Sequence, residues 1–476
     1  MFELHHLSAQ EQWDWIQRGD VSPTELVEHY LRRIERINPE IGALARVDAD
    51  AALDRAGAIA QSTPRTAELF GVPLAEKELN RRAGFPWSGG SRAFVGTVAD
   101  QTDEIVRVLD DAGAISLGTT TAPEFGMPSY TEPLGRPPVR NPYDTTLGAG
   151  GSSGGAAAAV AAGLLPFAPG SDGGGSIRIP AAATGLVGLK PSRGLIPATN
   201  HSLGGLVVNG PIARTVGDAA MLLDAMTARR NGGIDFASTL RAPDPGRLLG
   251  EAVRGEGRFQ IGVSTWSPWR NDYDIVLEPA ARSALDQAIE LLVSRGHGVD
   301  DAADPVTGEY ASAFRAVWQA GAAAIPLSDN QLNLVEPLTS WLIGQGRDLP
   351  VQRLVEALAF LAEFERGVIR TWFSREGSGV DAVLMPALAM TPRPIGWYDV
   401  DDGERNFAQQ VQYTPYTSFV NVTGLPAITL PVAVTEAGLP MGVQLIGRPG
   451  GEAALVSLGR QLERAVDWQR RHPPQW

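Results

Sequence analysis

The chain has 476 residues and a formal net charge of −14, from 54 acidic and 40 basic side chains. Hydrophobic residues make up 43% and charged residues 20%, which is typical of a globular protein with a large core. The absence of cysteine excludes thiol catalysis, cysteine-ligated metals and a disulfide framework. The acidic balance argues against a nucleic-acid-binding protein, which would need a basic face.

Lysine and histidine are both scarce. Lys77 and Lys190 are the only lysines, and every other basic residue is an arginine. Among six histidines only His5 and His6 are adjacent, and we interpret this pair as a surface accident rather than a metal site. The N-terminus lacks the pattern of a secretion signal, and no run of 18 apolar residues occurs. We therefore expect a cytoplasmic protein that does not contact membranes.

Helices and short apolar strands alternate along the chain. The segment Ser22–Glu25 has the pattern of a capping box with proline at the first helical position, and it predicts a helix to about Ile37. The other predicted elements are, in order, a strand at Leu69–Leu74, a helix at Thr102–Ala112, a strand at Ala114–Leu117, a helix at Ser153–Ala162, a strand at Leu164–Ala168, a loop at Pro169–Gly175, a strand at Phe259–Val263, helices at Leu277–Arg295, 309–325 and 351–376, strands at Ala382–Met385, Ala427–Val434 and Gly442–Ile446, and a helix from Glu452 to about Arg464.

This alternation predicts an α/β fold, a single domain whose central mixed, twisted sheet is covered by helices on both faces. We divide the domain into four segments. They are N-terminal helices in 1–65, a core with the catalytic loops in 66–230, a variable helical substrate region in 231–375, and an α/β part completing the sheet in 376–476.

Residues 148–176 differ in kind, because ten of these 29 residues are glycine. Neither glycine-rich loop contains the lysine of a P-loop, and the sixth position from Gly148 is Ser153 instead of a glycine, so nucleotide-binding patterns fail. The stretch Gly151–Gly155 matches a nucleophile elbow with Ser153 as nucleophile. The preceding residues, 141–146, are turn-like where an elbow needs a strand, so an α/β-hydrolase-like esterase stays an alternative.

A serine nucleophile needs a base, and lysine is the base this composition leaves. Burial lowers the pKa of a lysine and so allows it to act as a neutral base. Lys77 follows an apolar strand, and we expect its side chain to point inward while Glu76 and Glu78 point outward. The plain structural alternative is a buried lysine paired with a carboxylate.

Two serines in the glycine-rich region are candidates. Ser176 follows Gly173–Gly175, whose successive backbone N–H groups can form an oxyanion hole. Ser152 precedes the alanine-rich helix, where it can serve merely as the N-cap.

These residues lie in segments that resemble the amidase signature family, and most closely its bacterial amidases, aryl acylamidases and urethanases. The similarity runs from about residue 10 to about residue 470 and is weakest between 230 and 375. The matching segments are Gly71–Lys77, Pro123–Phe125, Arg140–Pro142, Gly150–Gly155, Gly170–Pro180, Gly188–Pro191, Val422–Ala427 and Gly438–Gln444.

The resemblance implies a triad in which Ser176 is the nucleophile, Ser152 the bridging serine on a cis Gly151–Ser152 bond, and Lys77 the base. It also implies no metal and no cofactor, and a packing role for Lys190. The implied oxyanion hole is formed by the N–H groups of Gly173, Gly174, Gly175 and Ser176. The implied supporting residues are Ser153, Asp172 and Arg178.

The sequence departs from the family pattern at a few positions. Ser171 stands where the motif usually has threonine, Gly173 occupies its variable position, and Glu78 stands where aspartate is common. A lysine usual in the run Gly118–Glu124 is absent. We expect none of these departures to touch the triad.

We therefore predict a hydrolase that cleaves the C–N bond of carboxamides through an acyl-enzyme. Six of the eleven tryptophans fall between Trp266 and Trp397, and 125–128 is apolar. Both features favour aryl acylamides or carbamates, with esters as a side activity and aliphatic amides or oligoamides as alternatives. The predicted substrate contacts are Met127, Ser129, Gly150 and Gly151.

Partners follow from the same interpretation. We expect a small-molecule amide or carbamate, no nucleic acid and no membrane, and a monomer or homodimer. An amidotransferase A-type subunit working in a complex is the alternative enzyme, although the acidic charge speaks against a tRNA partner. A non-catalytic amidase-like module would be expected to lose triad residues, and all three are present here.

Overall fold

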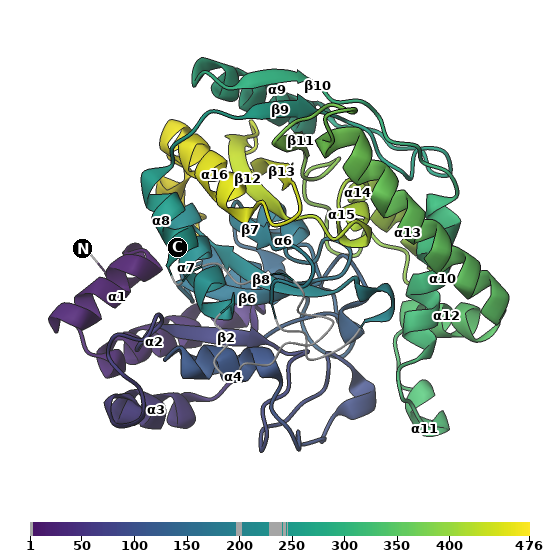
Figure 1. The fold of residues 1–476 in the computed structure, drawn as a ribbon. Helices are drawn as coiled ribbons and strands as arrows, with labels where there is room; N and C mark the ends of the chain where they lie inside the picture. Colours follow the sequence, from purple (N-terminus) through teal and green to yellow (C-terminus); the bar gives the residue numbers. More distant parts are fainter. Residues whose placement is uncertain (1–2, 197–201, 228–239, 241–243, 245) are drawn as a thin grey trace.

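The structure is a computed structural model that describes residues 3–196, 202–227, 240, 244 and 246–476 (Figure 1). The strands are β1 (Leu44–Val47), β2 (Pro73–Lys77), β3 (Ile115–Thr120), β4 (Arg140–Asn141), β5 (Asp144–Gly148), β6 (Phe167–Asp172), β7 (Val187–Lys190), β8 (Val208–Ala213), β9 (Gln260–Val263), β10 (Gly298–Asp301), β11 (Ala382–Pro386), β12 (Ala427–Val434) and β13 (Pro440–Gly447).

The helices alternate with these strands along the chain. They are α1 (Ala9–Arg18), α2 (Pro23–Ile41), α3 (Ala49–Ser62), α4 (Glu104–Asp111), α5 (Gly154–Ala161), α6 (Arg178–Ala183), α7 (Val216–Thr227), α8 (Arg247–Arg254), α9 (Pro279–Ser294), α10 (Tyr310–Ala323), α11 (Asp329–Leu332), α12 (Pro337–Arg347), α13 (Val351–Phe373), α14 (Gly403–Tyr413), α15 (Ser418–Val422) and α16 (Glu452–Val466).

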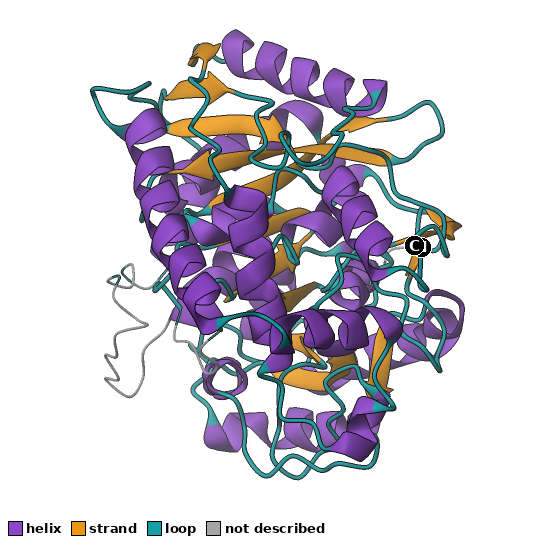
Figure 2. Ribbon diagram, turned by 90° about the vertical axis from the view of Figure 1, so that its right-hand side faces the viewer, coloured by secondary structure: helices purple, strands orange, loops and turns teal. Residues whose placement is uncertain are grey.

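The central sheet has eight strands in the order β10-β9-β11-β13-β12-β7-β8-β6. The pairs among β10, β9 and β11 are parallel and the remaining pairs are antiparallel, so the sheet is mixed. Helices lie on both sides of it (Figure 2). The predicted α/β class, with one domain built on a mixed sheet flanked by helices, is confirmed. The proposed boundary between 230 and 231 lies outside the described residues, and the division into four segments stays a prediction.

A smaller sheet, β1-β3-β2, packs beside the central one. Its strand β2, which ends in Lys77, lies against the edge strand β6, which ends in Asp172. This contact brings the lysine-bearing segment to the second glycine-rich loop, almost a hundred residues further along the chain.

The alanine-rich helix α5 is buried on every side. Small side chains all around the helix allow close packing against neighbouring strands, and a helix without a polar face has no stable place at the surface. Its N-cap is Ser153, and its C-terminal end leads through Gly163 into β6. The predicted helix at 153–162 is therefore confirmed, while the expected N-cap, Ser152, is free for another role.

Three predicted local structures are wrong. The predicted strand Leu69–Leu74 gives way to β2, so that Lys77 lies at the strand end instead of after it. Residues 169–172, predicted as loop, extend β6 because they pair with β8 at the sheet edge. An edge strand tolerates Pro169, whose nitrogen cannot donate to a ladder. The turn-like residues 141–146 include strands of the β4–β5 hairpin.

The described helices include none with the length and apolar character needed to cross a bilayer.

Candidate active site

Lys77 is the central charged group of the site. Its side chain is 1% exposed, and its Nζ lies 2.8 Å from Ser152 Oγ. Burial lowers the pKa of Lys77 to about 7, although the nearby carboxylates of Asp172 and Glu78 act in the opposite direction. A lysine with such a pKa has a substantial neutral fraction near pH 7, and the neutral amine can accept a proton.

The residues on either side of Lys77 do not point outward as expected. Glu76 and Glu78 are 3% and 6% exposed, so the predicted alternation is wrong. Glu76 pairs with Arg82, and Arg136 Nη1 donates to Glu78 Oε2 at 2.8 Å. Buried carboxylates are tolerated when they are paired in this way. The strand register also shifts between Leu74 and Glu76, which breaks the simple alternation of faces.

Ser171 is a second partner of Lys77. Its Oγ lies 3.1 Å and its carbonyl oxygen 3.4 Å from Lys77 Nζ. The expectation that no departure from the family pattern touches the triad is therefore wrong at this position. Residue 171 belongs to the strand β6 and not to a loop, and β6 packs against β2, which carries Lys77.

The first glycine-rich loop presents Ser152 to Lys77. The peptide bond between Gly151 and Ser152 is cis, as the family resemblance implies. Ser152 is 2% exposed, and the N–H of its neighbour Ser153 donates to the carbonyl of Ser176 at 3.1 Å. This bond holds the two serine-bearing loops side by side.

Ser153 does not resemble an exposed nucleophile. It is fully buried, and its Oγ donates to the carbonyl of Ser171 at 3.3 Å. A nucleophile elbow requires the serine hydroxyl to be accessible at the top of a sharp turn. The geometry fits a supporting role for Ser153, which agrees with the family resemblance.

Asp172 shapes the second glycine-rich loop. Its carboxylate accepts the N–H groups of Gly175 at 2.7 Å and Ile177 at 3.1 Å, and so folds the loop back on itself. The N–H of Gly175 is therefore engaged, which leaves Gly173, Gly174 and Ser176 as candidate oxyanion donors. Gly175 has a φ of +129°, a conformation that L side chains rarely adopt.

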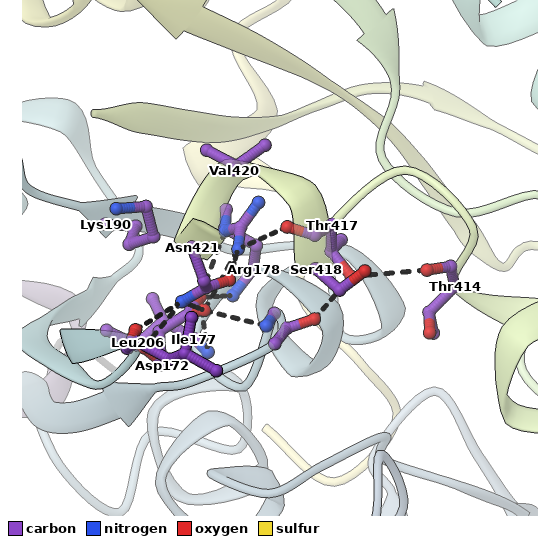
Figure 3. Close-up of polar contacts among 12 residues, drawn as sticks. Asp172, Ile177, Arg178, Lys190, Leu206, Thr414, Thr417, Ser418, Val420 and Asn421 are labelled. Atoms are coloured by element: carbon purple, nitrogen blue, oxygen red, sulfur yellow. Dashed lines mark hydrogen bonds and ion pairs between the residues drawn. The ribbon is translucent and has the colours of Figure 1, made fainter. Parts of the chain in front are cut away.

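A buried network holds Asp172 in place (Figure 3). Arg178 binds it through two parallel bonds, Nε to Oδ2 and Nη2 to Oδ1, each 3.0 Å long. Both residues are 0% exposed. Burial would raise the pKa of Asp172, but the charge and hydrogen bonds of Arg178, together with the charge of Lys190 and the bond from Asn421, outweigh it and hold this pKa below its usual range.

The C-terminal segment completes this network with residues that the sequence did not single out. Asn421 donates to the carbonyl and carboxylate of Asp172 at 2.7 and 2.9 Å, and its own Oδ1 accepts from Arg178 at 2.7 Å. Thr417 Oγ1 donates to the carbonyl of Gly174 at 2.7 Å. Their place next to the matching segment Val422–Ala427 was the one available signal.

Lys190 lies in β7 and is fully buried beside this network. Its Nζ donates to the carbonyl of Pro191 at 2.9 Å. Burial lowers the pKa of Lys190 to about 7, and the positive charge of Arg178 acts in the same direction. Within the described part of the chain, Lys190 forms no hydrogen bond with Ser152 or Ser176, which agrees with the implied packing role.

A pocket opens beside Ser176, with an empty volume of about 490 Å³ that is partly open to solvent. Met127 and Ser129 line it as predicted, whereas Gly150 and Gly151 are not among its lining residues, and their role in binding stays a prediction. The full lining is Met127, Pro128, Ser129, Gly174, Ser176, Ile179, Trp269, Phe314, Trp318, Phe407, Gln410, Val411, Thr414 and Ser418. None of these side chains carries a charge.

The tryptophan-rich region contributes to this pocket only in part. Trp269 and Trp318 line it, whereas Trp266 and Trp372 are buried in the aromatic core behind it. The aromatic wall comes from α10, α14 and the segment before α9, so residues of the poorly patterned middle do reach the site.

One group among the described residues has metal-ligand spacing, and it lies outside the pocket lining. His5 Nδ1 is 3.1 Å from His29 Nε2 and 3.4 Å from Glu3 Oε2. His5 is only 2% exposed, so its interpretation as a surface residue is wrong. Arg33 lies 3.8 Å from the Glu3 carboxylate. Burial lowers the pKa of His5 to about 2, and the positive charges of Arg33 and Arg214 add to this, a field that disfavours a cation.

Comparisons with known proteins agree with this site. A family model described as Amidase matches residues 25–456. The protein named "Putative amidase AmiB2" of Mycobacterium tuberculosis is 37% identical over 481 residues, which cover 99% of this chain and 98% of that protein. The fold and the sequence thus define an amide hydrolase. The chain belongs to the amidase signature family, whose reaction here is cleavage of an amide C–N bond.

Two solved structures show the same architecture. The 6-aminohexanoate cyclic dimer hydrolase complexed with substrate has a TM-score of 0.87 and 28% identity, covering 99% of this chain and 100% of that one. A bacterial aryl acylamidase of the amidase signature family has a TM-score of 0.82 and 25% identity, covering 98% and 97%.

Proposed function

We propose that this amidase hydrolyses aryl acylamides and aryl carbamates through a relay of Ser176, Ser152 and Lys77. The observation that carries the proposal is the contact of 2.8 Å between Ser152 Oγ and a fully buried lysine, next to a pocket that contains Ser176. An arginine could not serve in place of Lys77 because it does not lose its proton near neutral pH.

In the proposed mechanism, neutral Lys77 accepts the proton of Ser152 while Ser152 accepts the proton of Ser176. The Ser176 oxygen attacks the substrate carbonyl, and the resulting oxyanion binds free N–H groups of the Gly173–Ser176 loop. The C–N bond then breaks, and the amine leaves with a proton returned through Ser152. Water attacks the acyl-enzyme by the same relay, which releases the acid and restores Ser176.

The pocket supports the substrate class. Its lining is uncharged and rich in aromatic side chains, so it favours a neutral, apolar or aryl group over an ionic one. Carbamates have the same planar N–C=O group and pass through the same kind of tetrahedral intermediate. The similarity to an aryl acylamidase supports the aryl preference, and the similarity to a cyclic dimer hydrolase supports oligoamides as the alternative.

A hydrolysis panel on the purified chain tests this proposal. We expect turnover of anilides and aryl carbamates, slower turnover of aliphatic amides and some ester cleavage. Lys77→Met and Ser152→Ala should each lower kcat by orders of magnitude while the fold is retained, since members of one relay act as a unit. Absence of hydrolysis without added partner proteins would favour the amidotransferase A-type alternative.

The nucleophile is identified by covalent labelling. A fluorophosphonate should modify Ser176, and Ser176→Ala should abolish the labelling while the matched Ser153→Ala variant retains it. Labelling that survives in Ser176→Ala and disappears in Ser153→Ala would restore the esterase alternative.

A further inference from the structure

Ser418 contributes a hydroxyl group to the wall of the uncharged, largely aromatic pocket. It is the first residue of α15, and the preceding Thr417 anchors that helix to the carbonyl of Gly174 (Figure 3). A Cβ built on Gly174 would lie 3.9 Å from Ser418 Cβ. Ser418 therefore lies directly beside the loop that carries Ser176, on the wall of the same pocket.

Two buried side chains meet the Ser418 hydroxyl. Trp269 Nε1 lies 3.0 Å and the Tyr310 hydroxyl 2.9 Å from Ser418 Oγ. The indole N–H of Trp269 can only donate. Tyr310 is 0% exposed, and burial raises the pKa of its hydroxyl, so the phenol keeps its proton.

The donor in the bond between Tyr310 and Ser418 follows from the partners available to each hydroxyl group. Within the described residues, Ser418 is the one hydrogen-bond partner of the Tyr310 hydroxyl. If Ser418 donated to Tyr310, the phenolic proton would be buried without an acceptor, which is unfavourable. Tyr310 therefore donates, and both lone pairs of Ser418 Oγ are occupied by Trp269 and Tyr310. A serine hydroxyl has one proton to give. Among the described residues no side chain or carbonyl accepts this proton, so an acceptor atom of a substrate in the pocket that Ser418 lines can receive it.

We infer that Ser418 donates a hydrogen bond to an acceptor oxygen in the acyl half of the substrate, close to the scissile carbonyl. This inference rests on the proposed function and narrows it to amides whose acyl chain carries an ether, ester or second amide oxygen. The position of Ser418 beside Gly174 determines which substrate atom it can contact. The carbonyl group of the substrate would bind the loop that contains Gly174, so an acceptor oxygen one or two bonds from the carbonyl carbon would lie next to Ser418.

Gln410 is a second polar side chain on the pocket wall that carries hydrogen-bond donors. Its Oε1 accepts from the backbone N–H of Ser129 at 2.8 Å, and its Nε2 donates to Asn406 Oδ1 at 2.7 Å. These two bonds fix its orientation and use one of its two amide protons, so Gln410 has a further N–H that a ligand in the pocket could bind. The test must therefore isolate the hydroxyl of Ser418 from this second donor.

A matched pair of substrates provides the test. Methoxyacetanilide and butyranilide have the same shape, and an ether oxygen in the first replaces a methylene in the second. We expect the ratio of their kcat/KM values, ether over methylene, to fall about three- to tenfold in Ser418→Ala, the loss of one neutral hydrogen bond. The ratio within each variant cancels any loss of folded protein, and comparison of this ratio between variant and wild type cancels the difference in intrinsic reactivity of the two anilides.

Tyr310→Phe is the control variant. It removes a donor to Ser418 and retains the serine proton, so the substrate ratio should stay within about twofold of the wild-type value. An unchanged ratio in Ser418→Ala overturns the inference, and so does an equal fall in Tyr310→Phe, which would show that the ratio reports packing. Failure of the wild-type protein to cleave either anilide would instead overturn the proposed aryl acylamide function, and this inference with it.

Discussion

The protonated form of Lys77 is disfavoured because it places a charge in the protein interior. Its side chain is almost completely removed from water, and its pKa of about 7 places the change of protonation within the working range of a hydrolase. We expect kcat/KM to decline as the pH falls below about 7, because the ammonium form cannot accept the proton of Ser152. A pH–rate profile measured within the range where the protein stays folded checks this. A flat profile down to about pH 5 would contradict a lysine base.

Ser171 should shift the pH at which activity is lost on the acid side of the pH–rate profile, which we call the acid limb. Its hydroxyl oxygen accepts a bond from Lys77 Nζ at 3.1 Å, and an acceptor favours the ammonium form, which has the most protons to donate. In Ser171→Ala we expect the limb to move about 0.5 to 1 unit to lower pH, the effect of one hydrogen bond. Ser171→Thr keeps the hydroxyl and serves as the control. A limb that stays in place in the alanine variant, or moves upward, would exclude this role.

The loop between β6 and α6 depends on one glycine more than on the others. A Cβ on Gly175 would lie 2.4 Å from Thr417 Oγ1, and its φ of +129° is strained for any other residue. Gly174 has no positive φ, and a Cβ there meets nothing closer than 3.9 Å. We expect Gly175→Ala to lose about 2 kcal/mol or more of unfolding free energy and most activity.

Gly174→Ala is the matched variant for the same loop. Its unfolding free energy, measured by urea titration, should stay within about 0.5 kcal/mol of the wild-type value. Equal losses in the two variants would contradict the special requirement for glycine at position 175.

Elements with their own strong local pattern were predictable. The capping box at Ser22 begins α2, and the apolar, β-branched segments β12 and β13 lie close to where the sequence predicts strands. The strand β6 was not, because Pro169, Gly170 and Ser171 have low strand propensity and are held extended by pairing with β8. Its misassignment concealed the contact between Ser171 and Lys77.

At the scale of the whole molecule, the site joins segments that are distant in sequence. Lys77, Ser152 and Asp172 lie in matching segments, and the predicted partners Lys77 and Ser152 do meet. The aromatic wall and Asn421 could not be placed from sequence, because an isolated phenylalanine or asparagine carries no signal of its partner. The packing of the C-terminal segment and α10 onto the glycine-rich loop could not be predicted from the sequence.

Asn421 is the residue through which the C-terminal segment acts on the loop. Its amide binds Asp172 twice and Leu206 once, at 3.1 Å, while its oxygen accepts from Arg178. In Asn421→Ala these buried groups lose partners, which should cost about 2–4 kcal/mol of unfolding free energy. Because Asp172 shapes the loop that we propose binds the oxyanion, kcat should fall at least tenfold while KM changes little.

Asn141→Ala distinguishes this effect from general destabilisation. The Asn141 amide is equally buried, but its bonds go to Ala183 at 2.8 Å and Tyr143 at 3.1 Å, and neither residue belongs to the loop. We expect a comparable loss of stability, measured by urea titration, with kcat of the folded fraction retained. If both variants lost kcat in proportion to stability, Asn421 would be a packing residue. The C-terminal segment would then not act on the glycine-rich loop through Asn421.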